Sequence, residues 1–428
     1  MKKTLLTFAF AAAVFAGAFL IRQSLKDPLP NEVNTRRSGA MEALEFWTAS
    51  RAYPNDDIPA DKYYKAFLSS KQRIKQIPRE LASSATWEPI GPTNLHGRSL
   101  SVAINPQDKN TVYLGTASGG LWRSYGGGLG GDWEMVDLGF PALGIGAIVY
   151  DPVDTNIIYL GTGEVYRYLG ATGGLIIRTT RGSYGIGILK STDGGTTWFK
   201  SLDWTYNQQR GVQAMKLNPL NPSTVWAATT EGMYKSTDAG GTWNNVWPVI
   251  MATDVVVHLT DTNRILGAFG NLSSPSGGVY LTTDGGATWL PGAGLPSYSG
   301  KTQLHMYQSN PDWVYASVAD STTGVGALWR TTDFGTSWTE LSNYTTNGIF
   351  GVQGWYSHYA AVHPTDNTQV FHAAVGASKS TDGGVTFLGT SGLYPDNHGF
   401  AIDPTDPDII YSANDDGVYR STNFGQSF

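Results

Sequence analysis

The chain has 428 residues, of which 41% are apolar and 15% charged, with a net charge of −6 and no cysteine. This apolar content and length allow a large buried core and exclude global disorder. The acidic balance leaves no basic face for phosphate groups, so nucleic acid is excluded as an expected partner. Without cysteine, disulfides and thiolate metal sites are excluded, and we expect neither a cofactor nor a bound metal.

The first 23 residues are arranged like a secretory signal peptide. Lys2 and Lys3 precede an apolar run from Leu5 to Ile21, and Ala16-Gly17-Ala18 offers a cleavage site between small residues. The alternative is an uncleaved signal anchor, because the run approaches the ~18 residues that reach across a bilayer. We expect a bacterial protein that is secreted or displayed at the cell surface, with membrane contact only through an uncleaved signal.

Residues 24–85 differ in composition from the rest of the chain, being more charged and poor in glycine. Apolar residues in 41–47 and 63–68 are spaced for short amphipathic helices. We predict a helical lead-in or linker here, followed by the main domain over residues 86–428.

The main domain repeats one octet, which reads Ser-Thr-Asp-Gly-Gly-Thr-Thr-Trp at 191–198. Its third position is acidic in five copies and Asn in the sixth: Asp193, Asp238, Asp284, Asp333, Asp382 and Asn423. These positions lie 41 to 49 residues apart, a period that indicates a repeat architecture.

Each repeat also contains four short β segments. In the second repeat these are residues 147–150, 157–160, 186–190 and 198–201. Counting a degenerate first copy at Ser124 gives seven units, and four-stranded units repeated radially form a β-propeller. We therefore predict an all-β, seven-bladed propeller. Residues 86–90 resemble the strand that follows each octet, and we expect them to complete blade seven and close the ring.

The octet has a mechanical interpretation. Its Asp can bond backbone N–H groups and a hydroxyl of the same turn, a Gly supplies positive φ, and the aromatic residue anchors the turn. The alternative is that the Asp residues bind calcium or catalyse. Six similar copies around a ring cannot share one active site, so we assign them a structural role.

These octets resemble the Asp-box (BNR) repeats of sialidases, sortilin-type Vps10 domains and xyloglucanase-like glycosidases. Longer phrases at 151–154, 158–164 and 187–193 are similar to the second blade of xyloglucanase-like propellers and of bacterial sortilin-like secreted proteins. The opening phrase at 87–92 is similar to the start of the second group. Because that group commonly ends in a sorting domain and this chain ends inside a repeat at Phe428, we expect a C-terminally truncated propeller.

The resemblance to xyloglucanases implies a catalytic Asp in the first blade, within a Thr-Asp-x-Gly-Gly phrase. The corresponding phrase, Thr116–Gly120, has Ala117 in that place. Glycoside hydrolysis needs two carboxyl groups, so one of them is missing at its expected position. The resemblance puts the other in a second propeller. The remaining candidates for a catalytic carboxylate are Glu164, Asp396 and Asp416.

Binding residues are expected where the repeat is interrupted. The longest departure is the insertion at 164–185, whose Tyr, Arg and Gly content suits a sugar or peptide contact, with a solvated loop as the alternative. If the inner strands line a channel, Asp396, His398 and Asp416 would meet at one mouth as an acid/base pair or metal site; ordinary turn formation is the alternative. The candidate binding residues are Arg98, Tyr166, Arg167, Trp355, Tyr356 and His398.

From these features we expect an exported, monomeric binding or scaffold module that engages a glycan or protein through one face of the ring. The alternative is a glycoside hydrolase of the xyloglucanase-like kind acting on β-glucans. Sialidase chemistry is disfavoured, because the required Arg, Tyr and Glu types crowd one insertion. An assembly factor similar to the photosystem II propeller proteins fits the fold, but nothing in the sequence indicates a photosynthetic partner.

Overall fold

The computed structural model describes residues 39–55, 59–76 and 97–428, with gaps at 143, 167–181, 184, 206–209, 273, 297, 321–325 and 348–352. The chain divides into two compact units, residues 1–56 and 57–428. The first contains helix α2 (Gly39–Ala52), and the second begins with α3 (Ala60–Gln76). Both helices lie in the segment predicted to be helical. Among the described residues, no helix has the length and apolar character to cross a membrane, and the signal segment 1–23 lies outside them.

Seven antiparallel sheets follow one another along the second unit. The first two are β1 (Ser99–Asn105), β2 (Asp108–Thr116), β3 (Leu121–Ser124), β4 (Glu134–Val136), and β5 (Ile145–Tyr150), β6 (Ile158–Thr162), β9 (Gly187–Ser191), β10 (Phe199–Asp203). The third and fourth are β11 (Val212–Asn218), β12 (Asn221–Thr229), β13 (Gly232–Ser236), β14 (Asn244–Trp247), and β15 (Ala252–Val257), β16 (Ile265–Phe269), β17 (Gly278–Thr282), β18 (Leu290–Pro291).

The fifth and sixth sheets are β19 (Thr302–Met306), β20 (Val314–Ala319), β21 (Gly326–Thr331), β22 (Thr339–Asn343), and β23 (Tyr359–Val362), β24 (Val370–Ala373), β25 (Ala377–Ser380), β26 (Leu388–Gly389). The seventh has three described strands, β27 (Asn397–Ile402), β28 (Ile410–Asn414) and β29 (Gly417–Ser421). A separate pair, β7 (Glu164–Val165) and β8 (Gly182–Ser183), and the short helix α5 (Tyr344–Asn347) complete the described elements.

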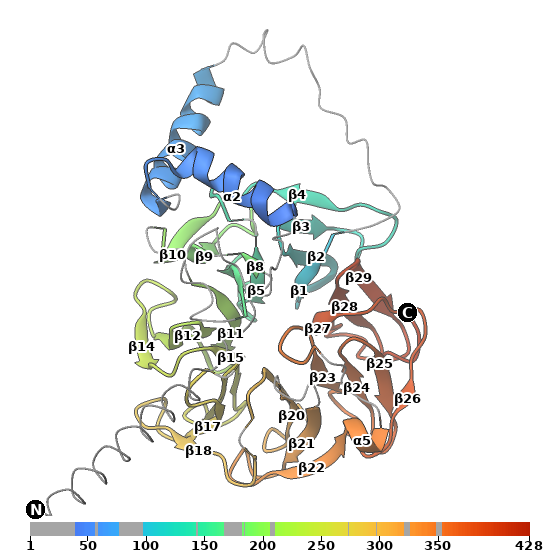
Figure 1. Cartoon of the computed structure of the whole chain (residues 1–428). Helices are drawn as coiled ribbons and strands as arrows, with labels where there is room; N and C mark the ends of the chain where they lie inside the picture. Colours follow the sequence, from blue (N-terminus) through green and yellow to red (C-terminus); the bar gives the residue numbers. More distant parts are fainter. Residues whose placement is uncertain are drawn as a thin grey trace, which may run out of the picture. The chain divides into compact units, whose positions relative to one another are not determined.

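The sheets form a closed ring. Figure 1 shows them arranged around a central axis, with the C-terminal blade beside the first blade. Inner strand β1 contacts both β5 and β27, and the Tyr411 hydroxyl donates to the carbonyl oxygen of Gly127 at 2.8 Å. The predicted seven-bladed propeller is therefore confirmed. The segment expected to supply the last strand, residues 86–90, lies outside the described residues.

Each octet is a hydrogen-bonded turn. One carboxylate oxygen of Asp193 accepts the backbone N–H of Thr197 at 2.8 Å, and the other accepts the Thr197 hydroxyl at 2.6 Å. These bonds lower the pKa of Asp193 to about 2, because they favour its charged form. The same pattern recurs at Asp238, Asp284, Asp333 and Asp382, and the Asn423 side-chain oxygen likewise accepts the N–H of Ser427 at 3.0 Å. The hydrogen bonds agree with the mechanical interpretation of the octet.

The second glycine of the octet is required by close packing between blades. Gly286 has φ 95°, and an added Cβ would lie 2.6 Å from the ring of Trp226 in the preceding blade. The first glycine position is less restricted: Ala239 and Phe334 occupy it in other copies with φ of 54° and 52°. Conservation of the second glycine among the copies thus follows from the fit of one blade against the next.

The degenerate octet of blade one is completed by a distant carboxylate. Asp132 accepts the Ser124 hydroxyl at 2.6 Å and the backbone N–H of Gly126 at 2.6 Å. These bonds lower the pKa of Asp132, and the hydrogen bond from Ser124 has the largest effect. The first blade therefore retains the turn although the octet is not recognisable in its sequence.

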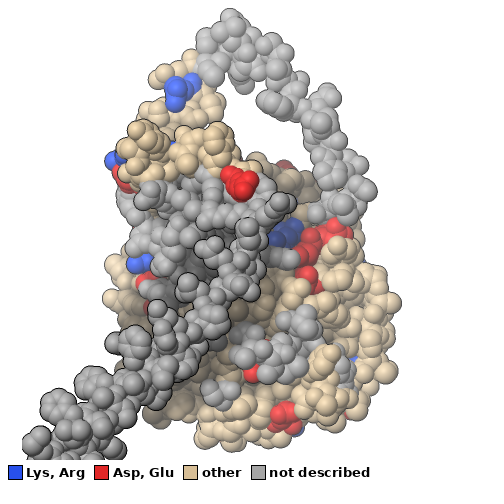
Figure 2. Space-filling view, in the orientation of Figure 1, with Lys and Arg blue, Asp and Glu red and all other residues tan. Residues whose placement is uncertain are grey.

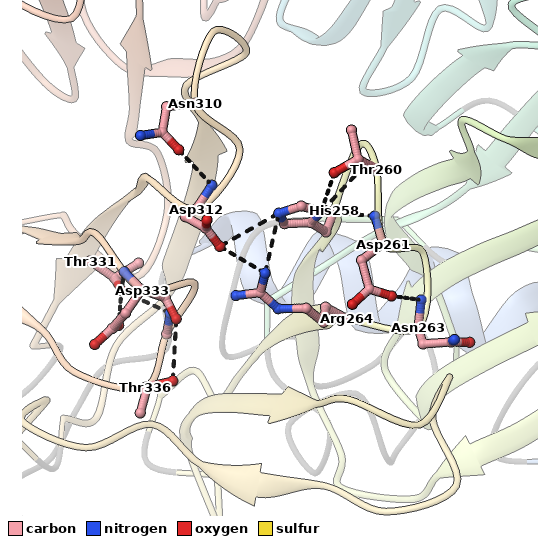
Figure 3. Close-up of polar contacts among 11 residues, drawn as sticks. His258, Thr260, Asp261, Asn263, Arg264, Asn310, Asp312, Thr331, Asp333 and Thr336 are labelled. Carbon is pink, nitrogen blue, oxygen red and sulfur yellow. Dashed lines mark hydrogen bonds and ion pairs between the residues drawn. The ribbon is translucent and has the colours of Figure 1, made fainter.

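A second recurring turn follows the inner strand and joins neighbouring blades. In blade four, Nδ1 of His258 accepts the N–H of Asp261 at 3.0 Å, and Arg264 pairs with Asp312 of blade five at 2.7 Å (Figure 3). Because Nδ1 accepts a backbone N–H, its lone pair must be free of a proton. Burial lowers the pKa of His258, which keeps the ring in this neutral form.

Candidate functional site

Seven side chains from four blades gather at one end of the central channel. We call them the mouth cluster: Arg98, Glu164, Tyr166, Trp355, Tyr356, His398 and Asp415. Arg98 precedes β1, Glu164 lies in β7, Tyr356 precedes β23, and His398 lies in β27. His398 also lines the cavity inside the channel, which places the cluster at the channel's mouth. Because each residue precedes, ends or follows a strand near the axis, the ring brings together positions that are far apart in sequence.

Glu164 is the first carboxylate of the cluster. Its side chain is 4% exposed and accepts the Arg98 guanidinium at 2.8 Å and the Tyr166 hydroxyl at 2.5 Å. Burial opposes the charge on Arg98, but the Glu164 carboxylate outweighs it and raises the pKa of the guanidinium. Burial also raises the pKa of Tyr166 far above its usual value, so this phenol stays protonated as a donor.

Asp415 is the second carboxylate, in the two-residue turn between β28 and β29. It accepts Nε2 of His398 at 2.8 Å and the Tyr356 hydroxyl at 2.9 Å. Burial would raise the pKa of Asp415, yet its hydrogen bond with His398 leads the effects that lower it overall. Burial lowers the pKa of His398, so at neutral pH we assign an ionised Asp415 that accepts the N–H of a neutral His398.

Aromatic rings join the two carboxylate centres. The rings of Tyr166 and Tyr356, which donate to the two carboxylates, lie 5.2 Å apart between centroids. Trp355 meets Tyr166 edge-on at 5.5 Å and is only half-buried. The Asn271 amide fixes this segment by donating to the Trp355 carbonyl oxygen at 2.8 Å. These rings form an aromatic surface with a hydrogen-bonded carboxylate on each side.

The structure brings together most of the residues predicted to form a site. Five of the six predicted binding residues and the candidate Glu164 lie in the mouth cluster, whereas Arg167 lies outside the described residues. The other two candidate carboxylates make separate contacts: Asp396 accepts the Ser357 hydroxyl at 3.4 Å, and Asp416 accepts the Tyr419 hydroxyl at 2.9 Å.

Asp415 is the residue that the sequence reasoning missed. Asn414-Asp415-Asp416-Gly417 offers two adjacent carboxylates in a turn, and sequence reasoning selected Asp416. Pairing of Asn414 with Gly417 makes the two aspartates the corner of a tight hairpin. The side chains of successive residues at such a corner point in different directions. Which of the two aspartates contacts His398 therefore depends on the three-dimensional form of the turn.

Ala117, which occupies the place of the carboxylate implied by the resemblance, lies next to this cluster. Its backbone N–H donates to the Arg98 carbonyl oxygen at 3.0 Å, and its own carbonyl accepts the Ser183 hydroxyl at 3.2 Å. The residue is 4% exposed. The backbone around this position is thus built into the mouth, but its side chain supplies no acid or base.

A cavity of about 320 Å³ continues from the mouth cluster into the channel. Gln213, Lys216, Asp254 and His305 are among its lining residues, together with the apolar side chains of the inner strands. A second cavity of about 200 Å³ shares Lys216 and His305 with it, so the two adjoin. Among the described residues, no three His, Asp or Glu side chains are placed to hold a metal ion. On the face drawn in Figure 2, few of the described side chains are charged.

Comparison with known proteins links this geometry to two groups. Residues 231–378 match the family described as sortilin, neurotensin receptor 3. A xyloglucanase of Hypocrea jecorina is 24% identical over 319 residues, which are 64% of this chain and 35% of that protein. A xyloglucanase of Acetivibrio thermocellus is 27% identical over 278 residues, 57% of this chain and 30% of its own length.

This protein is an Asp-box β-propeller that resembles sortilin and the xyloglucanases. The GH74 xyloglucanase of Xanthomonas campestris superposes with a TM-score of 0.58 and 19% identity, over 80% of this chain and 54% of that one. The YCF48 protein of Cyanidioschyzon merolae superposes with a TM-score of 0.50 and 14% identity, over 79% and 98% of the two chains. At these identities the two solved structures show the shared fold alone. The Asp-box propeller spans only about a third of the length of the curated xyloglucanases it matches.

Proposed function

We propose that this glycoside hydrolase-like propeller acts on β-glucan chains, binding them at the mouth cluster and cleaving a glycosidic bond there. The observation that carries the proposal is the pair of carboxylates, Glu164 and Asp415, joined by the contacting rings of Tyr166 and Tyr356. Glycoside hydrolysis requires two carboxyl groups that flank the scissile bond. The similarity to xyloglucanases supports this class of substrate.

The two carboxylates suit different roles. Asp415 is ionised at neutral pH and shielded by His398 and Tyr356, which suits a base or nucleophile. Glu164 supplies the second carboxyl group. One of its oxygens is held by Arg98 at 2.8 Å and the other by the Tyr166 hydroxyl, so a bound sugar must displace one of these partners to reach the carboxyl group. The half-buried Trp355 offers an apolar ring face for the sugar.

Binding without cleavage is the second candidate function, and Ala117 is the observation that favours it. The chain lacks a carboxylate at the place implied by the xyloglucanase resemblance, and both carboxylates in the mouth cluster already accept hydrogen bonds from a cation or histidine and a tyrosine. In this case the same surface would hold the glycan, and a partner domain or protein would use the bound chain.

A reducing-end assay on xyloglucan and mixed-linkage β-glucan separates the two. We expect the wild-type chain to release reducing ends, and Glu164→Gln and Asp415→Asn each to lower the rate by about 100-fold or more. Asp416→Asn is the matched control, because it removes the adjacent carboxylate that bonds Tyr419 instead of His398. If the wild-type chain binds these polymers but releases no reducing ends, the binding function replaces the hydrolase.

We also propose that the protein is exported, on the basis of its N-terminal 23 residues. Expression of the whole chain in a bacterial host, followed by N-terminal sequencing of the mature form, tests this. A mature N-terminus close to residue 18 in the secreted fraction is the expected result, whereas an intact Met1 in the membrane fraction would indicate an uncleaved anchor.

A further inference from the structure

The Lys301 side chain is largely buried, and its ammonium group has no hydrogen-bond partner among the described residues. The residue is 8% exposed and immediately precedes β19. Its backbone oxygen bonds Ala319 and His358, but the described part of the chain provides no hydrogen bond or ion pair to its side chain. A buried unpaired charge is costly and is rare in proteins unless it has a role. Burial lowers the pKa of Lys301 to about 8, against the opposing influence of Asp254 and then Glu164.

The Lys301 side chain lies beside the neck of the channel. Residues 303–305 of β19, the strand that begins directly after Lys301, all line the channel cavity. The charge of Lys301 interacts with Asp254 and His398, which also line this cavity, and with Glu164 of the mouth cluster. These neighbours place the ammonium group between the mouth cluster and the cavity.

A second donor without a partner among the described residues belongs to His305, four residues after Lys301. Nδ1 of His305 accepts the backbone N–H of Val362 at 2.9 Å, so the ring proton is on Nε2. The described residues offer no acceptor to this Nε2–H. Burial lowers the pKa of His305 to about 3, so the ring is neutral at physiological pH. The ring also packs edge-on against Phe400, which lines the same cavity, with centroids 4.9 Å apart.

The charges around the channel indicate a neutral ligand. Among the described residues, three cations, Arg98, Lys216 and Lys301, interact there with three carboxylates, Glu164, Asp254 and Asp415. An anion would add an uncompensated charge to this balanced set. A polyhydroxylated ligand would instead accept from Lys301 and His305, donate to neighbouring carboxylate oxygens, and lay an apolar face on Phe400.

We propose that the channel neck is a second binding site, which holds one or two sugar units at the end of a glycan chain through hydrogen bonds from Lys301 and His305. The choice of a sugar as the neutral ligand rests on the proposed function of the mouth cluster. A chain end that enters the channel leaves the rest of the polymer at the mouth, so the site recognises ends and short oligosaccharides in preference to the middle of a chain. The cavity of about 320 Å³ is at the small end of the range typical of ligand sites.

Isothermal titration of the full chain with cellobiose tests the site, with inorganic phosphate as the competing anion. We expect cellobiose to bind the wild type and Lys301→Met to weaken binding at least 10-fold. Lys235→Met is the matched control: this lysine is also partly buried, but it donates to the carbonyl oxygen of Gly285 at 2.7 Å between two blades, away from the channel. Equal cellobiose binding by wild type and Lys301→Met, or binding of phosphate but no sugar, would overturn the proposal.

A labelling experiment on the wild-type chain keeps the proposal testable if a variant does not fold. Reductive methylation at pH 8 followed by peptide mass spectrometry reports the reactivity of each amine. Saturating cellobiose should slow methylation of Lys301 several-fold and leave that of Lys235 unchanged; unchanged labelling of Lys301 would refute the site. Failure of the proposed hydrolysis is a separate result, because reducing-end release can be absent while cellobiose still protects Lys301.

Discussion

The contact between neighbouring blades predicts a large difference between two adjacent glycines. In Gly286→Ala, the added Cβ would lie 2.6 Å from Trp226 Cη2 and 3.2 Å from its Cζ3, at a residue with φ 95°. Trp226 is 1% exposed and cannot move outward without opening the core. A non-glycine residue at positive φ costs about 1 to 2 kcal/mol, and overpacking a core costs about 1 to 3 kcal/mol, so we expect a loss of about 2 to 5 kcal/mol.

Gly285→Ala is the matched control for this variant. Its φ is 71°, its nearest neighbour to an added Cβ is Asn263 Oδ1 at 3.3 Å, and the equivalent position in other blades already holds Ala239 or Phe334. We expect a loss of about 1 kcal/mol from backbone strain alone. Denaturant unfolding followed by tryptophan fluorescence measures both variants. Equal destabilisation by the two would refute the argument that close approach to Trp226 fixes the second glycine.

Three further predictions concern charge. Burial lowers the pKa of several histidines, that of His372 to about 3, so the unfolded chain binds more protons than the folded chain below pH 6.5. The melting temperature should therefore fall from pH 6.5 towards pH 3. A flat profile over this range would contradict the burial argument. Octet carboxylates such as Asp193, with a pKa of about 2, stabilise the fold above about pH 4, and this contribution should be lost as the pH falls towards 2. Asp193→Asn should make the fall in melting temperature less steep in that window, because it removes one of the five octet carboxylates; an unchanged slope would contradict this. Arg98→Gln leaves Glu164 buried without its cation and should lower the free energy of unfolding by about 3 kcal/mol in denaturant unfolding. Arg123→Gln is the control, because Arg123 pairs with the more exposed Glu134 and should cost less. Equal costs for the two variants would contradict this prediction.

Repeat spacing made the propeller accessible from sequence, because every blade uses the same local turn. The hydrogen bonds that Thr197 donates to Asp193 lie within five residues, so their pattern is visible in the chain. Blade one shows the limit of that approach. There Asp132 reaches back eight residues to Ser124, and the octet is no longer continuous in sequence.

The mouth cluster was only partly predictable. The insertion at 164–185 pointed to Glu164 and Tyr166, and clusters that enter the inner strands of blades six and seven pointed to Trp355 and His398, because residues that the blades do not share are free to specialise. Asp415 was not selected over Asp416, since the choice between them depends on the corner of one hairpin. Lys301 gave no signal at all, because a single lysine before a strand is ordinary in sequence.

The sequence by itself determined the repeat, its turns and the number of blades, since these depend on hydrogen bonds between near neighbours and on alternation along short strands. The tertiary structure decided which side chains meet. Arg98 and Glu164 are 66 residues apart, and Tyr356 and Asp415 are 59 apart. These two contacts join neighbouring blades, whereas the contact between Tyr166 of blade two and Tyr356 of blade six exists only because the closed ring brings the ends of inner strands around one axis.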